Sequence, residues 1–159
     1  MEQRLNYPKL APEPFKAMYG VGAYLAGCGL EKGLLELVKI RVSQINGCAF
    51  CLDMHTKDAR AGAETEQSIY LLNAWREAPF FTERERAALA WAEAVTQISA
   101  VVSNAVYTEA CQPFSEKELV DLNWAVVTIN AWNRIAISFR SVSGTYQPTK
   151  PSHQASEGT

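Results

Sequence analysis

Two cysteines and a histidine lie close together in this chain and have the properties of a reactive thiol site. Two residues separate Cys48 from Cys51, and three separate Cys51 from His55. In a helix that turns about 100° per residue, the three side chains share an arc of about 60°. A helix N-terminus or a protonated imidazole lowers the pKa of a thiol and makes it reactive. The spacing therefore predicts thiol chemistry on one face of a helix.

Glu36 is a carboxylate with apolar neighbours on both sides, which is unusual unless it has a partner. If the helices on either side of Gly47 fold back on each other, Glu36 and His55 lie about 16 and 12 Å from the turn. The two side chains would then be level, and the carboxylate could orient the imidazole and relay its proton. The alternative is a structural ion pair of Glu36 with Lys39 or Arg41.

The residues alone do not decide which thiol reacts. Cys48 lies closer to the start of its expected helix, where the helix dipole favours a thiolate. Cys51 is one helical turn from His55, so the imidazole is its neighbour. Zinc also binds thiolates and imidazole, but structural zinc takes four ligands, and the other histidine, His153, lies in the C-terminal segment. The ligand count therefore disfavours zinc, and we expect a site without a metal or cofactor.

The elements that must position these residues are all expected to be helices. Apolar residues at spacings of three and four, capping boxes at Thr82 and Ser115, and glycine stops predict about seven helices. Their expected ranges are 14–26, 31–46, 48–61, 65–75, 82–99, 103–111 and 115–139. We predict an all-α, single-domain helical bundle, in which an antiparallel helix hairpin carries Cys48 and Cys51.

The composition fits one globular domain. The chain has 159 residues, 48% of them hydrophobic, and a net charge of −2. A nucleic-acid-binding surface normally has a basic excess, a membrane span needs about 18 apolar residues, and a signal peptide needs an apolar core. We expect a cytoplasmic protein that binds neither nucleic acid nor membrane. Residues 1–143 should form the domain, and residues 144–159 a flexible tail.

Other polar and sulfur-containing residues are expected to be structural. Cys28 and Cys111 have no partner near them in the sequence, and a free buried cysteine behaves as a small hydrophobic residue. Asn130, Asn133 and Arg134 place polar groups on an otherwise apolar helix. Because buried polar groups find partners, we expect them to hydrogen-bond other helices or a neighbouring subunit.

The pattern formed by Glu36, Cys48, Cys51 and His55 resembles the motif of the alkylhydroperoxidase D-like family, within the carboxymuconolactone decarboxylase superfamily. The resemblance covers residues 14–139 and includes the Asn-rich segment of the last helix. It implies helical subunits in trimers or hexamers and peroxide reduction by a dithiol. Cys51 would attack the peroxide, Cys48 would resolve the sulfenic acid to a disulfide, and Glu36 and His55 would relay protons.

The implied enzyme is a thiol-dependent peroxidase or disulfide reductase, a peroxiredoxin-like hydroperoxide reductase with a dithiol, thioredoxin-type or lipoyl-type reductant as partner. Phe50 stands where the founding type of the family has a histidine next to the second cysteine. Decarboxylases of the superfamily lack the cysteine pair, which disfavours that activity here. The alternatives are a non-enzymatic redox adaptor or sensor that uses the same disulfide and, less favoured, a zinc-binding protein.

Overall fold

The computed structural model describes residues 2–99 and 101–148, and within these ranges its regular structure is helical. In chain order the elements are α1 (Tyr7–Leu10), α2 (Pro12–Leu25), α3 (Lys32–Asn46), α4 (Ala49–Ala61), α5 (Glu66–Leu71), the 3₁₀ turn η1 (Leu72–Ala74), α6 (Glu83–Thr96), α7 (Asn104–Ala110) and α8 (Glu116–Phe139). No strand occurs in the described residues, which confirms the all-α prediction. None of their helices is long and apolar enough to cross a membrane.

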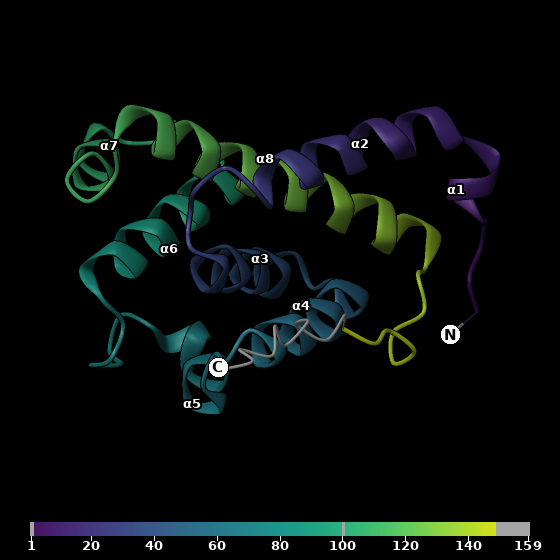
Figure 1. Ribbon diagram of the computed structural model, residues 1–159, viewed down its shortest axis with the longest axis horizontal. Helices are drawn as coiled ribbons and strands as arrows, with labels where there is room; N and C mark the ends of the chain where they lie inside the picture. The colour runs from purple at the N-terminus through teal and green to yellow at the C-terminus, as the bar shows by residue number, and fades with distance from the viewer. Residues whose placement is uncertain (1, 100, 149–159) are drawn as a thin grey trace, which may run out of the picture.

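α3 lies at the centre of the bundle and packs against α4, α6 and α8. Figure 1 shows α2 and α8 along one side of the molecule, with α3 and α4 beneath them. One face of α3, with Val38 and Val42, belongs to the larger apolar core, which α6 and α8 complete. The other face, with Leu37 and Ile40, belongs to a second core with α5, η1 and part of α6. α3 is therefore fixed from two sides, which holds its remaining side against α4.

Two capping boxes fix where long helices begin, as the sequence predicts. The Thr82 hydroxyl accepts from the backbone N–H of Glu85, whose carboxylate accepts from the backbone N–H of Thr82 at 2.8 Å. Ser115 and Glu118 form the same pair at the start of α8. Each box satisfies amide donors that the first turn of a helix otherwise leaves without partners.

The helix boundaries differ most from the sequence prediction in three places. α1 is an additional short helix, which Asn6 caps by accepting from the backbone N–H of Lys9. The helix expected through Trp75 ends as α5 at Leu71 and continues as η1. A 3₁₀ turn aligns residues three apart, which brings both Leu72 and Trp75 into the core. α6 ends at Thr96 rather than at residue 99, because its C-cap Gln97, with φ −94° and ψ 35°, leaves the helical conformation.

Candidate functional site

A left-handed turn at Gly47 reverses the chain and places the first cysteine at the start of α4. Gly47 has φ 70° and ψ 33° and is the C-cap of α3, a conformation that glycine adopts at little cost. Cys48 follows as the N-cap of α4, and its backbone N–H still donates to the Ser43 carbonyl. The predicted helix stop at this position is confirmed, and it puts the Cys48 thiol where the helix dipole favours negative charge.

The two thiols of the motif form a buried, hydrogen-bonded pair. Cys48 and Cys51 are each 1% exposed, and both are free thiols. The backbone N–H of Cys51 donates to Cys48 Sγ at 3.4 Å. A hydrogen bond from the Cys51 thiol, against the effect of burial, lowers the pKa of Cys48 to about 7. The same bond and burial raise the pKa of Cys51. Of the two thiols, Cys48 is therefore the one that ionises first as the pH rises.

A pocket of about 900 Å³ reaches one member of this pair. Cys51 and His55 line it, whereas Cys48 is not among the lining residues. Its wall includes Phe15, Tyr19 and Trp132, which pack edge to face or tilted with ring centroids 4.8–5.8 Å apart. The thiol that a molecule in the pocket would meet is therefore that of Cys51, while the lower pKa belongs to its partner.

Glu36 and His55 meet across α3 and α4, as the distances from the turn predict. His55 Nδ1 lies 2.8 Å from Glu36 Oε2, and Lys39 Nζ donates to Glu36 Oε1 at 2.6 Å. Burial raises the pKa of Glu36, but the hydrogen bond with His55 and the charge of Lys39 outweigh it, so the pKa lies below its ordinary value. Glu36 is thus an ionised carboxylate between an ammonium group and the imidazole. The predicted pairs with His55 and with Lys39 are both present.

Asp58 is a second carboxylate beside His55. One ligand atom from each of Glu36, His55 and Asp58 lies within 4.8 Å of the others. The Asp58 carboxylate accepts from the hydroxyl of Tyr146 at 2.7 Å. Within this group Lys39 forms an ion pair with Glu36, and the expectation that the site works without a metal stays a prediction. Neither Asp58 nor Tyr146 is a site residue that the motif predicts.

A buried amide contacts both thiols from α8. Asn133 is fully buried, and its side chain amide acts to lower the pKa of both Cys48 and Cys51. Its orientation is fixed because it accepts from Asn46 Nδ2 at 2.8 Å and donates to Ser43 Oγ at 3.0 Å. The predicted hydrogen bonding of Asn133 to other helices is confirmed. Its contact with the thiols was not predicted, although its place in the Asn-rich segment is the signal that could have indicated it.

The remaining cysteines lie elsewhere, and the C-terminal segment begins at the site. Cys28 is half-buried against the larger core and Cys111 is exposed, and neither lines the pocket. Residues 144–148 of the predicted tail lie against α4 through Tyr146. The rest of that predicted tail, with His153, lies outside the described residues.

Comparison with known proteins identifies the family. Residues 12–94 match the model of the carboxymuconolactone decarboxylase family. The uncharacterized protein YdfG of Bacillus subtilis is 45% identical over 139 residues, which are 87% of this chain and 95% of YdfG.

Two solved structures show how widely the fold is used. A protein of unknown function from Agrobacterium tumefaciens, whose name proposes the antioxidant defence protein AhpD, is 43% identical with a TM-score of 0.87, over 91% of this chain and all of that one. The debrominase Bmp8 shares the fold at 19% identity and a TM-score of 0.77, over 84% of this chain and 73% of its own. The protein belongs to the carboxymuconolactone decarboxylase family and is an AhpD-like member of that superfamily.

Proposed function

We propose that this protein is a thiol-dependent peroxidase that reduces organic hydroperoxides through Cys48 and Cys51. The observation that carries the proposal is the hydrogen-bonded thiol pair at the start of α4, at the wall of a pocket that also contains His55. A thiol pair one helical turn apart can close to a disulfide, and an adjacent imidazole can move the protons that the reaction requires.

Access to the pocket and the pKa values of the two thiols together assign different roles to Cys48 and Cys51. Cys51 lines the pocket and is the thiol that meets the substrate. Its proton lies in the hydrogen bond to Cys48, so a shift of that proton to Cys48 leaves the thiolate at Cys51. Cys48 therefore acts first as the acceptor of this proton and afterwards as the resolving thiol.

The reaction balances in three steps. The Cys51 thiolate attacks one peroxide oxygen, the O–O bond breaks, and the leaving alkoxide takes a proton from the His55–Glu36 pair to become an alcohol. Cys48 then attacks the sulfur of the Cys51 sulfenic acid, which forms the disulfide and releases water. An external dithiol of the thioredoxin or lipoyl type transfers two electrons and restores both thiols by exchange.

The pocket supports an organic rather than an inorganic peroxide. Its wall is largely apolar, with aromatic rings from α2 and α8 and Phe50 beside Cys51. Its polar lining includes the neighbouring side chains of Glu36, His55 and Asp58. A hydroperoxide with an apolar body would place its body against the rings and its oxygens at the polar end. The AhpD name carried by the Agrobacterium relative is consistent with this substrate class.

The test measures disulfide formation and turnover in the same preparation. A variant with Cys28→Ser and Cys111→Ser leaves two thiols, which are mapped by mass spectrometry before and after one equivalent of cumene hydroperoxide. A Cys48–Cys51 disulfide, followed by many turnovers when a dithiol is supplied, supports the enzyme. Consumption of a single equivalent without turnover identifies a redox sensor instead. Two thiols that stay reduced contradict both.

The proposal includes a cytoplasmic homo-oligomer, either a trimer or a hexamer. Val120, Trp124 and Val127 lie exposed on one side of α8, at the spacing of a single helix face. Apolar side chains gathered in this way commonly mark contacts between subunits. Sedimentation of the wild type and of Trp124→Glu measures the assembly. We expect the substitution to shift it to monomers, and a monomeric wild type contradicts this part of the proposal.

A further inference from the structure

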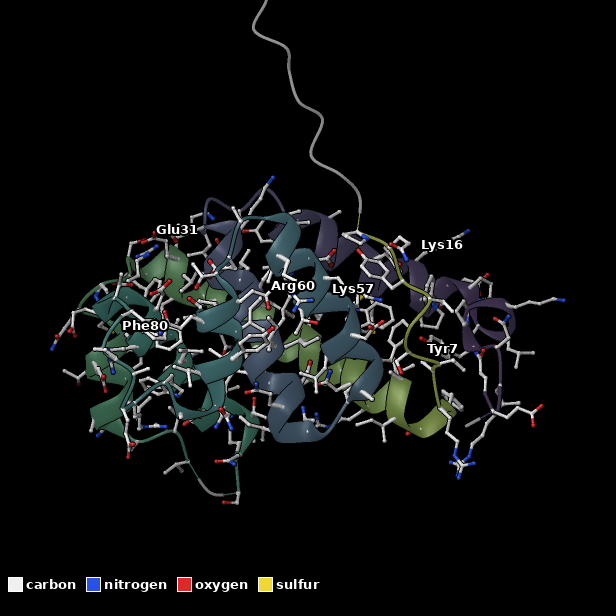
Figure 2. All side chains as sticks on the ribbon, turned by 90° about the horizontal axis from the view of Figure 1, so that it is seen from below. Tyr7, Lys16, Glu31, Lys57, Arg60 and Phe80 are labelled. Carbon is white, nitrogen blue, oxygen red and sulfur yellow. The ribbon has the colours of Figure 1, made fainter. Side chains whose placement is uncertain are left out.

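The segment after α8 is fastened to α4 by three hydrogen bonds. The backbone N–H of Gly144 donates to Asp53 Oδ2 at 2.9 Å, and Lys57 Nζ donates to the Tyr146 carbonyl at 3.0 Å. The Tyr146 hydroxyl donates to Asp58 Oδ1 at 2.7 Å. In Figure 2 this yellow segment runs past α4 on the side where Lys57 lies. All three partners belong to α4, and Asp53 and Lys57 lie one turn apart on the same side of the helix.

These bonds bring the side chain of Tyr146 into the pocket. Tyr146 lines it together with Glu36, His55 and Asp58, and its side chain is half-buried. Burial, the hydrogen bond to Asp58 and the negative charges of Asp58 and Glu36 all raise the pKa of Tyr146. The phenol therefore keeps its proton at neutral pH and acts as a hydrogen-bond donor to Asp58.

Asp58 is a second carboxylate close to the imidazole of His55. The carboxylate of each lies within 4.8 Å of a ring nitrogen of His55. Glu36 has donors in Lys39 and in His55 itself. The phenol of Tyr146 is the donor that occupies Asp58. Without it, Asp58 would turn an unshared negative charge towards the imidazole and could replace Glu36 as its partner.

The ionisable groups around His55 come from several elements. They are Glu36 and Lys39 of α3, Cys51 and Asp58 of α4, Tyr19 of α2, and Tyr146 after α8. Within this cluster, Tyr146 is hydrogen-bonded to Asp58. Through this hydrogen bond, residues 144–148 contribute to the surroundings of His55.

We infer that Tyr146 is a positioning residue that acts through Asp58 to keep His55 paired with Glu36, so that residues 144–148 form part of the site. The functional meaning of this role rests on the proposed peroxidase, because the proton relay requires the imidazole of His55 to exchange its proton with Glu36. The inference itself concerns the reduced protein alone. It can therefore be tested without any peroxide.

The experiment is an NMR titration of the imidazole in a His153→Gln background, which leaves His55 as the one histidine of the chain. Tyr146→Phe removes the hydroxyl and keeps the ring. We expect the titration midpoint of His55 to rise by about half a pH unit, because Asp58 then stabilises the imidazolium more strongly. Asp58→Asn removes the charge, and the midpoint should fall by a similar amount. Tyr70→Phe, at an exposed tyrosine, should leave it unchanged.

The double variant shows whether Tyr146 acts through Asp58. In the Asp58→Asn background, Tyr146→Phe should cause no further shift, because the carboxylate it acts on is gone. The same shift in both backgrounds overturns the inference, as does an unchanged midpoint in Tyr146→Phe. If Tyr146→Phe unfolds, Asp58→Asn alone decides, since an unchanged midpoint there removes Asp58 from the cluster.

The two proposals fail separately. A preparation that shows the expected His55 shifts but forms no disulfide with peroxide contradicts the peroxidase and leaves the role of Tyr146 standing. A preparation that turns over peroxide while Tyr146→Phe leaves the titration of His55 unchanged contradicts only the inference about Tyr146.

Discussion

The backbone N–H of Cys51 points at the sulfur of Cys48, 3.4 Å away, so the first turn of α4 itself stabilises a thiolate at its N-cap. The side chain of Cys51 is also the main cause that lowers the pKa of Cys48, while the pKa of Cys51 itself is raised. The pocket reaches Cys51 and not Cys48, so the thiol with the lower pKa is not the thiol that lines the pocket.

Replacement of each cysteine separates the two roles. We expect Cys51→Ser to abolish peroxide consumption, because the thiol at the pocket wall is lost. Cys48→Ser should still react once, leaving a sulfenic acid on Cys51 that cannot close to a disulfide. Trapping with a dimedone reagent and mass spectrometry locates the modified sulfur. A stable sulfenic acid on Cys48 in the Cys51→Ser protein would reverse the assignment.

The pH dependence of alkylation measures the charge on Cys48. Its pKa is lowered to about 7, so its thiolate is present above that pH and is lost as the pH falls through it. Cys51→Ala removes the hydrogen bond that is the main cause, and the midpoint should move up towards the ordinary value of about 8.5. Iodoacetamide labelling followed by mass spectrometry gives the midpoint in both proteins. Equal midpoints would show that Cys51 does not stabilise the Cys48 thiolate.

Asn133→Ala should act in the same direction. The amide side chain lowers the pKa of both thiols, so its loss should raise the pKa of Cys48. Asn130→Ala is the matched control, because Asn130 also bonds Asn46 from α8 but is not among the groups that shift either thiol. Iodoacetamide labelling over the same pH range should show a higher midpoint for Asn133→Ala than for the control. A shift of equal size in both variants would indicate a general loosening of the Asn46 network.

The sequence predicts the parts of the site that follow from regular helices. The distances of Glu36 and His55 from Gly47 are multiples of a constant rise, and the hydrogen bond between the two side chains agrees with them. Capping boxes and the Gly47 stop are local signals of the same kind. They depend on neighbouring residues alone, so no knowledge of the packing is needed to use them.

Two features depend on contacts that the sequence does not display. Tyr146 hydrogen-bonds to Asp58 of α4, which lies 88 positions earlier in the chain. The composition of the segment that contains Tyr146 predicts a flexible tail rather than a contact with the site. Asn133 contacts the thiols only because α8 packs across α3 and α4. Likewise, α5 continues as η1 at Leu72, and both Leu72 and Trp75 are buried in the second core. Local helix propensity does not reveal this packing.

Glu36→Gln tests the proton relay. The substitution keeps the size of the side chain but removes the charge that pairs with His55 and Lys39. Because general acid–base groups contribute about 100-fold or more, we expect a fall of about 100-fold in the maximal rate of cumene hydroperoxide reduction, with little change in KM. Stopped-flow assays between pH 6 and 9 compare it with Glu13→Gln, at an exposed glutamate. Overlapping pH–rate curves for Glu36→Gln and the wild type would remove Glu36 from the mechanism.

The carboxylate of Glu93 in α6 binds α3 and the residues that follow η1, and its loss should lower the stability of the fold. Its carboxylate accepts from Arg41 Nε at 2.7 Å, Trp75 Nε1 at 2.9 Å and Arg76 Nη1 at 2.6 Å. Hydrogen bonds to a charged group are worth about 1.5–3 kcal/mol, so Glu93→Gln should lower the free energy of unfolding by about 2 kcal/mol. Urea denaturation followed by circular dichroism measures this at pH 7, with Glu77→Gln at an exposed position as the control.

The effect of Glu93→Gln should depend on pH with a defined sign. Burial raises the pKa of Glu93, but hydrogen bonds from Trp75, Arg76 and Arg41 outweigh it, so the folded value lies below the unfolded one. The carboxylate therefore stabilises the fold fully above the unfolded pKa of about 4.3, and this stabilisation is lost as the pH falls through the folded value. The urea midpoints of wild type and Glu93→Gln should differ at pH 7 and converge on acidification. A difference that stays constant down to the lowest pH at which the protein folds would mean that the charge of Glu93 contributes nothing.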